Sequence, residues 1–211
     1  MNKKERVKKI IEVFDRIYPD AGCSLVYKDP LQLLVAVQLS AQCTDAKVNE
    51  VTKTLFAKYK TLDDFADVDV KELEEEIKPT GFYRNKARNI KMCCQMIRDK
   101  FGGMIPDNLD DMLKLPGVGR KTANLVLGDV FGIPGIVVDT HAKRLSQRIG
   151  LTGNEDPVKI EFDLMEVVPK AEWNRFCHQL IFHGRAICTA MKPKCNKCPI
   201  IEYCDFGRNH S

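Results

Sequence analysis

The sequence predicts an all-α protein, and three features of the chain support this fold class. Apolar residues recur at the spacing of a helix face in successive segments. Residues that cap helix N-termini, mainly Asp and Thr, precede several of these segments. No segment alternates convincingly between apolar and polar residues with a period of two, which is the pattern of a half-buried strand.

The composition is that of a soluble globular protein with one sizeable core or two small domains. The chain has 211 residues, of which 44% are hydrophobic and 29% charged, and its net charge of +4 permits a polyanionic partner. No apolar run approaches the ~18 residues of a membrane span, and Met1–Arg6 lacks the apolar stretch of a signal peptide. We therefore expect a cytoplasmic protein without membrane contact, whose nine cysteines stay reduced.

The helix-start signals give the expected order of helices. An amphipathic first helix stops at Pro19, and Asp29 followed by Pro30 begins a second helix that reaches about Ala41. The second helix is apolar nearly all round, so we expect it at the centre of a bundle. Further helices are expected over about 84–101, from Trp173 to about 185, and after Thr44, Thr61, Asp69, Asp139 and Asp156.

One expected helix carries a basic run beside its apolar face. The apolar face is formed by Ala87, Ile90, Cys94, Ile97 and Phe101. The basic side chains, which lie mostly off that face, are Arg84, Lys86, Arg88 and Lys91. We expect them to form a solvated surface, with phosphate contact as the alternative. The adjacent Cys93 and Cys94 are expected to pack in the core.

A glycine-rich hairpin between two helices is the most informative stretch of the chain. The segment Leu115–Ala123 reads Leu-Pro-Gly-Val-Gly-Arg-Lys-Thr-Ala; a short capped helix precedes it, and a helix ending near Gly132 follows. Gly117 and Gly119 allow a tight hairpin because glycine accepts positive φ without a Cβ clash. The backbone N–H groups of this helix-hairpin-helix unit, about 107–131, and the positive end of its second helix are expected to bind a phosphate.

Lys121 and Asp139 are the candidate catalytic residues. Lys121 stands in the first turn of the second helix, where the helix dipole and the neighbouring Arg120 favour a neutral, nucleophilic amine. The alternative is that Lys121 only contacts a phosphate. A P-loop is excluded because Arg120 separates Gly119 from Lys121. Asp139 lies 18 positions after Lys121; aspartate is among the best N-cap residues, so capping alone would also explain it.

Four cysteines near the C-terminus have the spacing of a metal-binding loop. Cys188, Cys195, Cys198 and Cys204 follow the pattern Cys-x6-Cys-x2-Cys-x5-Cys. Irregular short spacings of this kind are typical of a [4Fe–4S] cluster, whereas zinc ribbons favour two Cys-x2-Cys pairs. The spacing therefore favours iron–sulfur, with zinc and a metal-free loop as alternatives. Lys192, Lys194 and Lys197 in this loop either offset the charge of a cluster or contact phosphate.

These motifs together closely resemble the endonuclease III family, which comprises helix-hairpin-helix DNA glycosylases that also cleave at abasic sites. The resemblance includes Leu-Ser-Ala-Gln-Cys-Thr-Asp at 39–45 and Gly-Phe-Tyr-Arg-Asn-Lys-Ala at 81–87, and it covers nearly the whole chain. It implies two helical lobes with the active site in a central cleft. One lobe is continuous, 24–133; the other joins 1–23 to 134–211 and carries the cluster loop 188–204.

The resemblance also implies roles for particular residues. Lys121 aligns with the nucleophilic lysine and Asp139 with the catalytic aspartate. Gln42 matches the residue that fills the gap left by a flipped nucleotide, and Phe82 stands where the family usually wedges a leucine between bases. Further DNA contacts are expected from Gly117, Gly119, Arg120, His141, Lys192 and Lys194. The implied cofactor is a [4Fe–4S] cluster on the four cysteines, and the implied partner is damaged double-stranded DNA, bound by a monomer.

The implied function is that of a bifunctional DNA glycosylase/AP lyase in base excision repair. Such an enzyme removes oxidised pyrimidines through a lysine Schiff base and cleaves 3′ to the abasic site by β-elimination; pyrimidine dimers are an alternative lesion. The nearest rival, an adenine glycosylase acting on mismatches, lacks a lysine at the position of Lys121 and uses a glutamate in the segment matching 39–45, where this chain has none. A DNA-binding module or an electron carrier is the alternative from another class.

Overall fold

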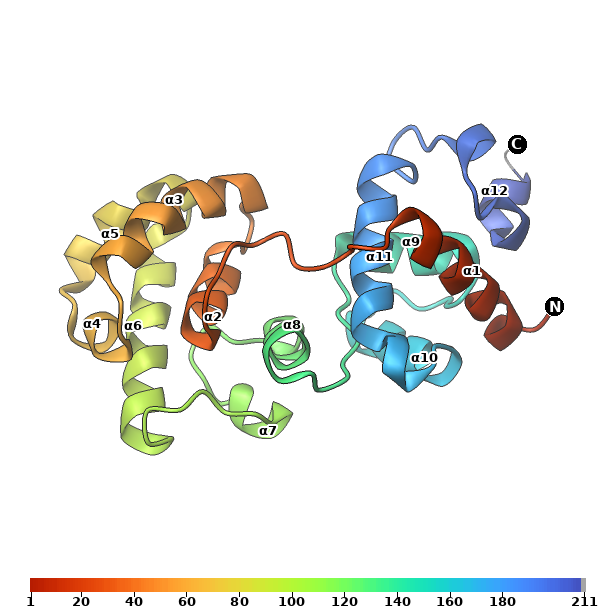
Figure 1. Cartoon of the computed structure of the whole chain (residues 1–211). Helices are drawn as coiled ribbons and strands as arrows, with labels where there is room; N and C mark the ends of the chain where they lie inside the picture. Colours follow the sequence, from red (N-terminus) through yellow and green to blue (C-terminus); the bar gives the residue numbers. More distant parts are fainter. Residues whose placement is uncertain (210–211) are drawn as a thin grey trace. The chain divides into compact units, whose positions relative to one another are not determined.

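The computed structural model describes residues 1–209 and divides the chain into two compact units (Figure 1). One unit, which we call the terminal unit, joins Met1–Gly22 to Pro134–Ser211. The other, the internal unit, is Cys23–Ile133. The boundaries expected from the sequence, 24–133 and 1–23 with 134–211, lie within one residue of this division.

Each unit is built from short helices. The internal unit contains α2 (Pro30–Leu39), α3 (Asp45–Lys58), α4 (Leu62–Asp67), α5 (Val70–Ile77), η1 (Lys78–Thr80), α6 (Tyr83–Lys100), α7 (Leu109–Met112) and α8 (Arg120–Phe131). The terminal unit contains α1 (Lys3–Ile17), α9 (Thr140–Ile149), α10 (Pro157–Val167), η2 (Lys170–Glu172), α11 (Trp173–Ala186), η3 (Cys195–Lys197), η4 (Ile201–Tyr203) and α12 (Asp205–Asn209). Residues 1–209 contain no strand, and the predicted all-α class is confirmed. Within the same residues, no helix is both long and apolar enough to cross a membrane.

The predicted helix starts are confirmed by hydrogen bonds from backbone N–H groups to side chains. Asp29 accepts such a bond from Gln32 at 2.9 Å, and Pro30 occupies the first helical position. The other predicted N-caps accept equivalent bonds: Thr44, Thr61, Asp69, Asp139 and Asp156. Each cap satisfies an N–H group that the helix leaves without an internal partner, and each contributes about 1 kcal/mol.

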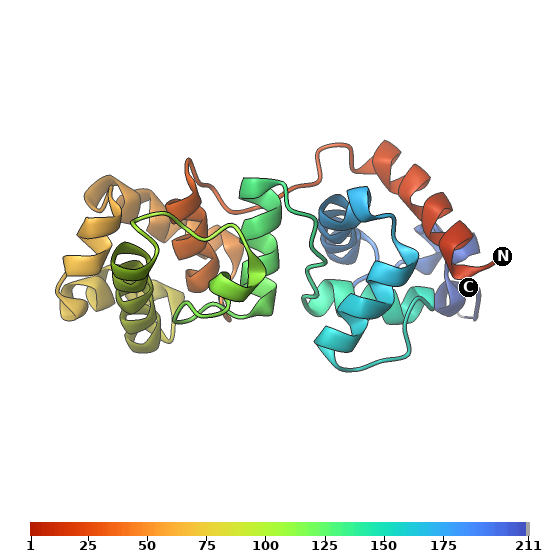
Figure 2. The same cartoon turned by 90° about the horizontal axis from the view of Figure 1, so that it is seen from below.

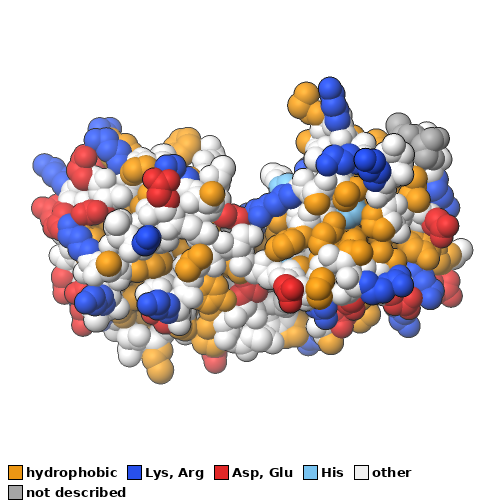
Figure 3. All heavy atoms as spheres, turned by 45° about the horizontal axis from the view of Figure 1, so that its top comes forward, with side chains coloured by type: hydrophobic (Ala, Val, Ile, Leu, Met, Phe, Trp, Pro, Cys, Tyr) orange, Lys and Arg blue, Asp and Glu red, His pale blue; other side chains and the backbone are white. Residues whose placement is uncertain are grey.

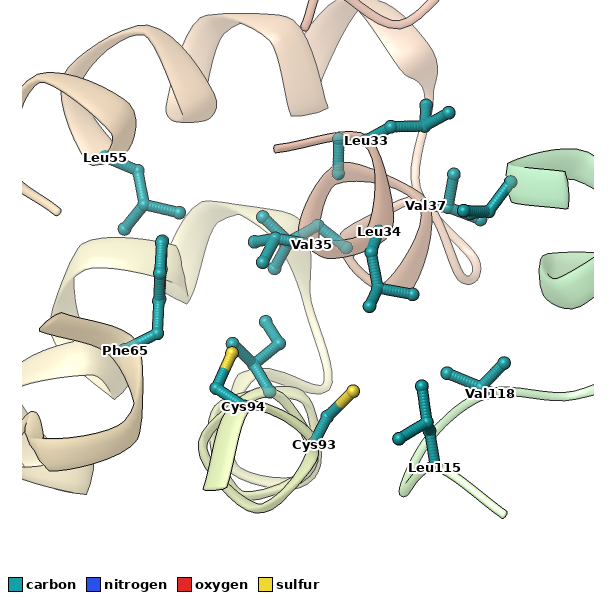
Figure 4. Close-up of a cluster of buried hydrophobic side chains, with 14 of the residues drawn as sticks. Leu33, Leu34, Val35, Val37, Leu55, Phe65, Cys93, Cys94, Leu115 and Val118 are labelled. Atoms are coloured by element: carbon teal, nitrogen blue, oxygen red, sulfur yellow. The ribbon is translucent and has the colours of Figure 1, made fainter. Parts of the chain in front are cut away.

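The internal unit is organised around α2, as its all-round apolar sequence predicted. Every residue from Leu33 to Leu39 is buried, and α2 contacts α3, α6 and α8. Figure 4 shows part of this core, in which side chains of α2 lie near those of α6 and of the segment before α8. Cys93 and Cys94 of α6 are each 1% exposed, which confirms their predicted packing. Burial raises the pKa of Cys93 to about 12, so its thiol stays protonated and unreactive.

The terminal unit joins the two ends of the chain. Figures 1 and 2 show α1 and α12 within the same unit. Arg6 of α1 makes a 3.0 Å ion pair with Asp205 at the start of α12 and donates a 2.7 Å hydrogen bond to the carbonyl of Ile149. Phe14 packs against Phe176 of α11, with ring centroids 6.2 Å apart. On the face seen in Figure 3, Lys and Arg side chains are interspersed with Asp and Glu.

Candidate active site and cluster loop

The hairpin before α8 depends on one glycine with a left-handed backbone. Gly117 has φ of 76°, and a Cβ built on it would lie 2.9 Å from Cβ of Asn89 and 2.9 Å from Oε1 of Gln38. The hairpin backbone therefore packs directly onto α2 and α6, which no other residue type would allow. Gly119 differs from the expectation: its φ of −93° is ordinary, and a Cβ there would meet no atom within 4 Å.

The start of α8 has the features of an anion site. Gly119 is its N-cap and supplies no side-chain acceptor for the first N–H groups of the helix. Lys121 lies exposed in the first turn, beside the half-buried Arg120. The positive end of the helix and the N–H groups of its first turn together favour a phosphate here.

Asp139 and His141 lie at the start of α9 in the terminal unit. Oδ1 of Asp139 accepts a 2.7 Å hydrogen bond from the backbone N–H of Ala142, so Asp139 is the N-cap of this helix. Nδ1 of His141 lies 3.1 Å from the guanidinium of Arg144. Burial lowers the pKa of His141; the charge of Asp139 opposes this shift, and that of Arg144 adds to it.

Gln42 and Phe82 share an unusual backbone conformation. Among residues 1–209 they are the only non-glycine residues with positive φ, 53° and 49° respectively. Both are exposed, Phe82 to 62%. They line one cavity of the internal unit, together with Gly117 and residues of α2 and α6.

The prediction that the basic side chains of α6 form a solvated surface is wrong for Lys86. Lys86 is only 6% exposed, and its Nζ donates hydrogen bonds to two backbone carbonyls, whereas Arg84 and Arg88 are exposed as expected. The positions 86, 90, 93 and 97 follow one another at helical spacing, so the sequence did contain a signal for burial. That signal was masked by the default assumption that lysine faces solvent.

The four cysteines of the loop 188–204 line one cavity of the terminal unit. Three of their sulfur atoms face nitrogen atoms. Arg148 donates to Sγ of Cys188 at 3.3 Å, the backbone N–H of Gly207 donates to Sγ of Cys204 at 3.3 Å, and Nε2 of His183 lies 3.4 Å from Sγ of Cys198. Donors aimed at sulfur are what a metal-bound thiolate needs in its surroundings.

The chemistry of these thiols fits a metal cluster. Burial raises the pKa of Cys198 to about 11, and the charges of the other three cysteines add to the shift. The thiol of Cys198 therefore stays protonated in the absence of a metal, and coordination to a metal would deprotonate it. Within residues 1–209, no three His, Cys, Asp or Glu side chains are grouped as ligands of a single metal ion. The assignment of all four cysteines as ligands stays a prediction.

Residues that the sequence did not single out hold the loop in place. Arg148 of α9 donates to the carbonyls of Thr189 at 2.8 Å and Ala190 at 2.7 Å. His183 of α11 is 1% exposed, and burial lowers its pKa to about 4, so the ring is neutral. Its Nδ1 lies 3.0 Å from the hydroxyl of Tyr18. When that hydroxyl donates to Nδ1, the ring proton is on Nε2 and points to the sulfur of Cys198.

Lys192 and Lys194 are both exposed on this loop. Nζ of Lys194 donates a 3.1 Å hydrogen bond to the carbonyl of Ala186, the last residue of α11. The carbonyl of Lys192 accepts a 2.7 Å bond from the hydroxyl of Thr189. The loop thus presents two lysines from a backbone that is tied to α11 and to itself.

Comparison with known proteins identifies the family. Residues 35–170 match the family described as HhH-GPD superfamily base excision DNA repair protein. The chain is 50% identical to the endonuclease III of Synechocystis sp. over 204 residues, 96% of this chain and 93% of that protein. It is 48% identical to the endonuclease III of Bacillus subtilis over 206 residues, 96% of this chain and 94% of that protein.

A solved structure gives the same result. A trapped covalent intermediate of an endonuclease III with DNA, an estranged-adenine complex, matches with a TM-score of 0.94 and 46% identity. The match covers 100% of this chain and 99% of that one. Fold, motifs and relatives agree, and the chain belongs to the endonuclease III family of DNA glycosylases/AP lyases, within the HhH-GPD superfamily of base excision DNA repair proteins.

Proposed function

We propose that the chain is a bifunctional DNA glycosylase/AP lyase that removes oxidised pyrimidines from duplex DNA. The observation that carries this proposal is the exposed Lys121 in the first turn of α8, next to an N-cap without a side chain. The related endonuclease III that was trapped as a covalent intermediate with DNA supports attack by such an amine. We further propose that the protein acts as a cytoplasmic monomer.

In the proposed reaction Lys121 is the nucleophile. A base inside a duplex is out of reach, so the nucleotide first leaves the stack, at a cost of roughly a few kcal/mol. The neutral Nζ forms a bond to C1′ of the deoxyribose while the bond from C1′ to the base breaks. The base leaves with that electron pair and takes up a proton. Opening of the sugar ring then gives a protonated imine between C1′ and Nζ.

The imine makes the lyase step possible. Its positive charge acidifies the proton on C2′. When a base removes that proton, the electron pair forms a double bond between C2′ and C3′, and the bond from C3′ to its phosphate oxygen breaks. The strand is thereby cut 3′ to the abasic site, and water hydrolyses the imine to free Lys121. One amine thus serves both activities.

Asp139 is proposed to supply the carboxylate for this chemistry. Ionised, it takes the proton of the lysine or stabilises the positive charge that grows on the sugar. Its Oδ1 accepts the hydrogen bond from Ala142, and Oδ2 is the oxygen proposed for this role. Capping and catalysis are therefore compatible on one side chain.

The proposed DNA contacts divide into phosphate-binding and base-probing groups. Phosphates are bound by the backbone of Gly117 and Gly119 at the start of α8 and by the side chains of Arg120, His141, Lys192 and Lys194. Gln42 fills the gap left by the flipped nucleotide, and the exposed ring of Phe82 wedges between bases. The phosphate contacts position the duplex, and the two probing side chains test whether a base leaves its stack.

The proposed cofactor is a [4Fe–4S] cluster held by Cys188, Cys195, Cys198 and Cys204. When bound, it neutralises the thiolates and cross-links the loop. No step of the reaction passes through it. Its proposed role is to fix the backbone that carries Lys192 and Lys194.

Duplexes that each contain one defined lesion test this function. The panel holds thymine glycol, 5-hydroxycytosine, a pyrimidine dimer, an adenine–guanine mismatch and a preformed abasic site. We expect release of the oxidised pyrimidines. The strands that carried them and the strand with the preformed abasic site should all be cleaved, leaving an unsaturated aldehyde at the 3′ end. Base release without strand cleavage, or activity on the mismatched adenine alone, would show that the proposal is wrong.

A further inference from the structure

The two loops that carry Gln42 and Phe82 are held in a conformation that their sequences do not favour. Non-glycine residues rarely adopt positive φ, and they keep it only where the surrounding structure holds them. Both residues line the same cavity, of about 220 Å³, which also reaches Gly117 of the hairpin. The residues that form the walls of this cavity are therefore the ones placed to hold both loops.

Lys86 connects the starts of the two loops. Its Nζ donates a 2.8 Å hydrogen bond to the carbonyl of Leu39 and another, also 2.8 Å, to the carbonyl of Thr80. Leu39 is the last residue of α2, three positions before Gln42. Thr80 is the last residue of η1, two positions before Phe82. One ammonium group thus binds the chain just before each strained residue.

The contacts of Lys86 require a hydrogen-bond donor at position 86. The carbonyl of Leu39 is among those that a helix leaves unpaired at its C-terminus, where the dipole favours positive charge. Thr80 is 2% exposed, so its carbonyl has no access to bulk water as a substitute donor. An apolar side chain at position 86 would leave two buried acceptors without a donor.

We propose that Lys86 is a positioning residue that fixes the Gln42 and Phe82 loops relative to each other, so that both side chains enter damaged DNA together. The inference rests on the proposed function, in which these two side chains probe the duplex. It adds a residue that acts through them, since Lys86 is buried and its Nζ is bonded to the carbonyls of Leu39 and Thr80.

Equilibrium binding to two duplexes tests the proposal. One duplex contains a tetrahydrofuran residue, a stable analogue of the abasic site, and the other has the same sequence without damage. We expect Lys86→Met to bind the analogue duplex about tenfold or more weakly, because two hydrogen bonds from a charged donor are lost. Binding to the undamaged duplex stays within about twofold, since phosphate contacts dominate there.

Lys91→Met is the matched control. Lys91 lies on the same helix and its Nζ also donates to a carbonyl, that of Val68, at 2.8 Å, but it does not line the cavity. We expect this variant to bind both duplexes as the wild type does. If Lys86→Met keeps the wild-type preference for the analogue duplex, the proposal is wrong.

Cleavage of single-stranded DNA with an abasic site separates positioning from general damage to the fold. No duplex has to be probed in this substrate, so the rate constant of Lys86→Met should stay within about twofold of the wild type. Base release from duplex DNA by the same variant should fall with its binding. A uniform loss across all substrates would contradict the proposal, because it would mean that Lys86 only maintains the fold.

A double-mutant cycle gives a test that does not need a folded Lys86→Met. Gln42→Ala, Phe82→Ala and the double variant are compared in binding to the analogue duplex. Side chains that enter together should give non-additive losses, whereas additivity within about twofold would overturn the proposal. Failure of the proposed function differs from both results, because the wild type would then show no preference for the analogue duplex.

Discussion

Asp139 accepts a hydrogen bond from the backbone N–H of Ala142 at 2.7 Å, so the proposed catalytic carboxylate is also the N-cap of α9. The two roles depend on different properties of the side chain. Any short oxygen acceptor caps a helix, whereas proton transfer and the stabilisation of a cationic sugar require negative charge. Substitutions at this position therefore separate stability from catalysis.

We predict that Asp139→Asn and Asp139→Ser fold normally but release bases about 10²–10⁴-fold more slowly, because they keep a cap and lose the charge. Asp139→Ala should lose the same activity and about 1 kcal/mol of unfolding free energy in addition. Single-turnover kinetics and denaturant unfolding measure the two effects. A wild-type rate of base release in Asp139→Asn would mean that Asp139 serves only as a helix cap.

The two hairpin glycines should respond differently to the same substitution. Gly117→Ala places a Cβ 2.9 Å from Asn89 in a left-handed backbone, and we expect it to lower the unfolding free energy by about 1–3 kcal/mol. A Cβ at Gly119 meets nothing within 4 Å, so Gly119→Ala should fold as the wild type. It should nevertheless bind undamaged duplex more weakly, since a methyl group then stands at the proposed phosphate site. Equal stability of the two variants would contradict this description of the hairpin.

Lys192 and Lys194 should contribute to the salt dependence of DNA binding. Each phosphate contact adds about 0.9 to the slope of log K against log salt, so Lys192→Ala/Lys194→Ala should reduce the slope by about 2. The control is Lys4→Ala/Lys8→Ala, which removes the same charge from two exposed positions of α1. Binding titrations over a range of salt concentrations distinguish a local contact from a general charge effect. Identical slopes for the two double variants would exclude the local contact.

The contact of His183 with Cys198 should set the reduction potential of the proposed cluster. A hydrogen bond to a ligand sulfur stabilises the more negative, reduced state, so His183→Phe should lower the potential. Phenylalanine keeps the aromatic packing of His183 on Phe14, whose centroids are 5.0 Å apart. His178→Phe is the control, because His178 lies on the same helix but does not line the cluster cavity. Protein-film voltammetry measures both variants; an unchanged potential in His183→Phe would rule out this role.

Local signals in the sequence predicted much of the fold. Asp29 with Pro30 predicted the start of α2, and Gly132 the end of α8, because capping depends on a few neighbouring residues. The burial of α2 followed from its own composition. The left-handed backbone of Phe82 was not predictable, since an aromatic residue carries no preference for it.

Contacts between distant residues were not visible in the sequence. Lys86 lies at helical spacing from Ile90, yet nothing in the sequence shows that the carbonyl of Leu39, 47 positions away, accepts its hydrogen bond. Likewise, nothing in the sequence shows that Tyr18 contacts His183, which lies 165 positions away. Motif spacing identified the residues of the proposed chemistry, and tertiary structure identified those that hold them.

Covalent trapping tests the central claim most directly. Borohydride is added during turnover on duplex DNA with an oxidised pyrimidine, and the adduct is mapped to a peptide by mass spectrometry. We predict an adduct on Lys121 in the wild type and in Lys86→Met, and none in Lys121→Ala. An adduct that persists in Lys121→Ala, or wild-type base release that never yields one, would contradict the account.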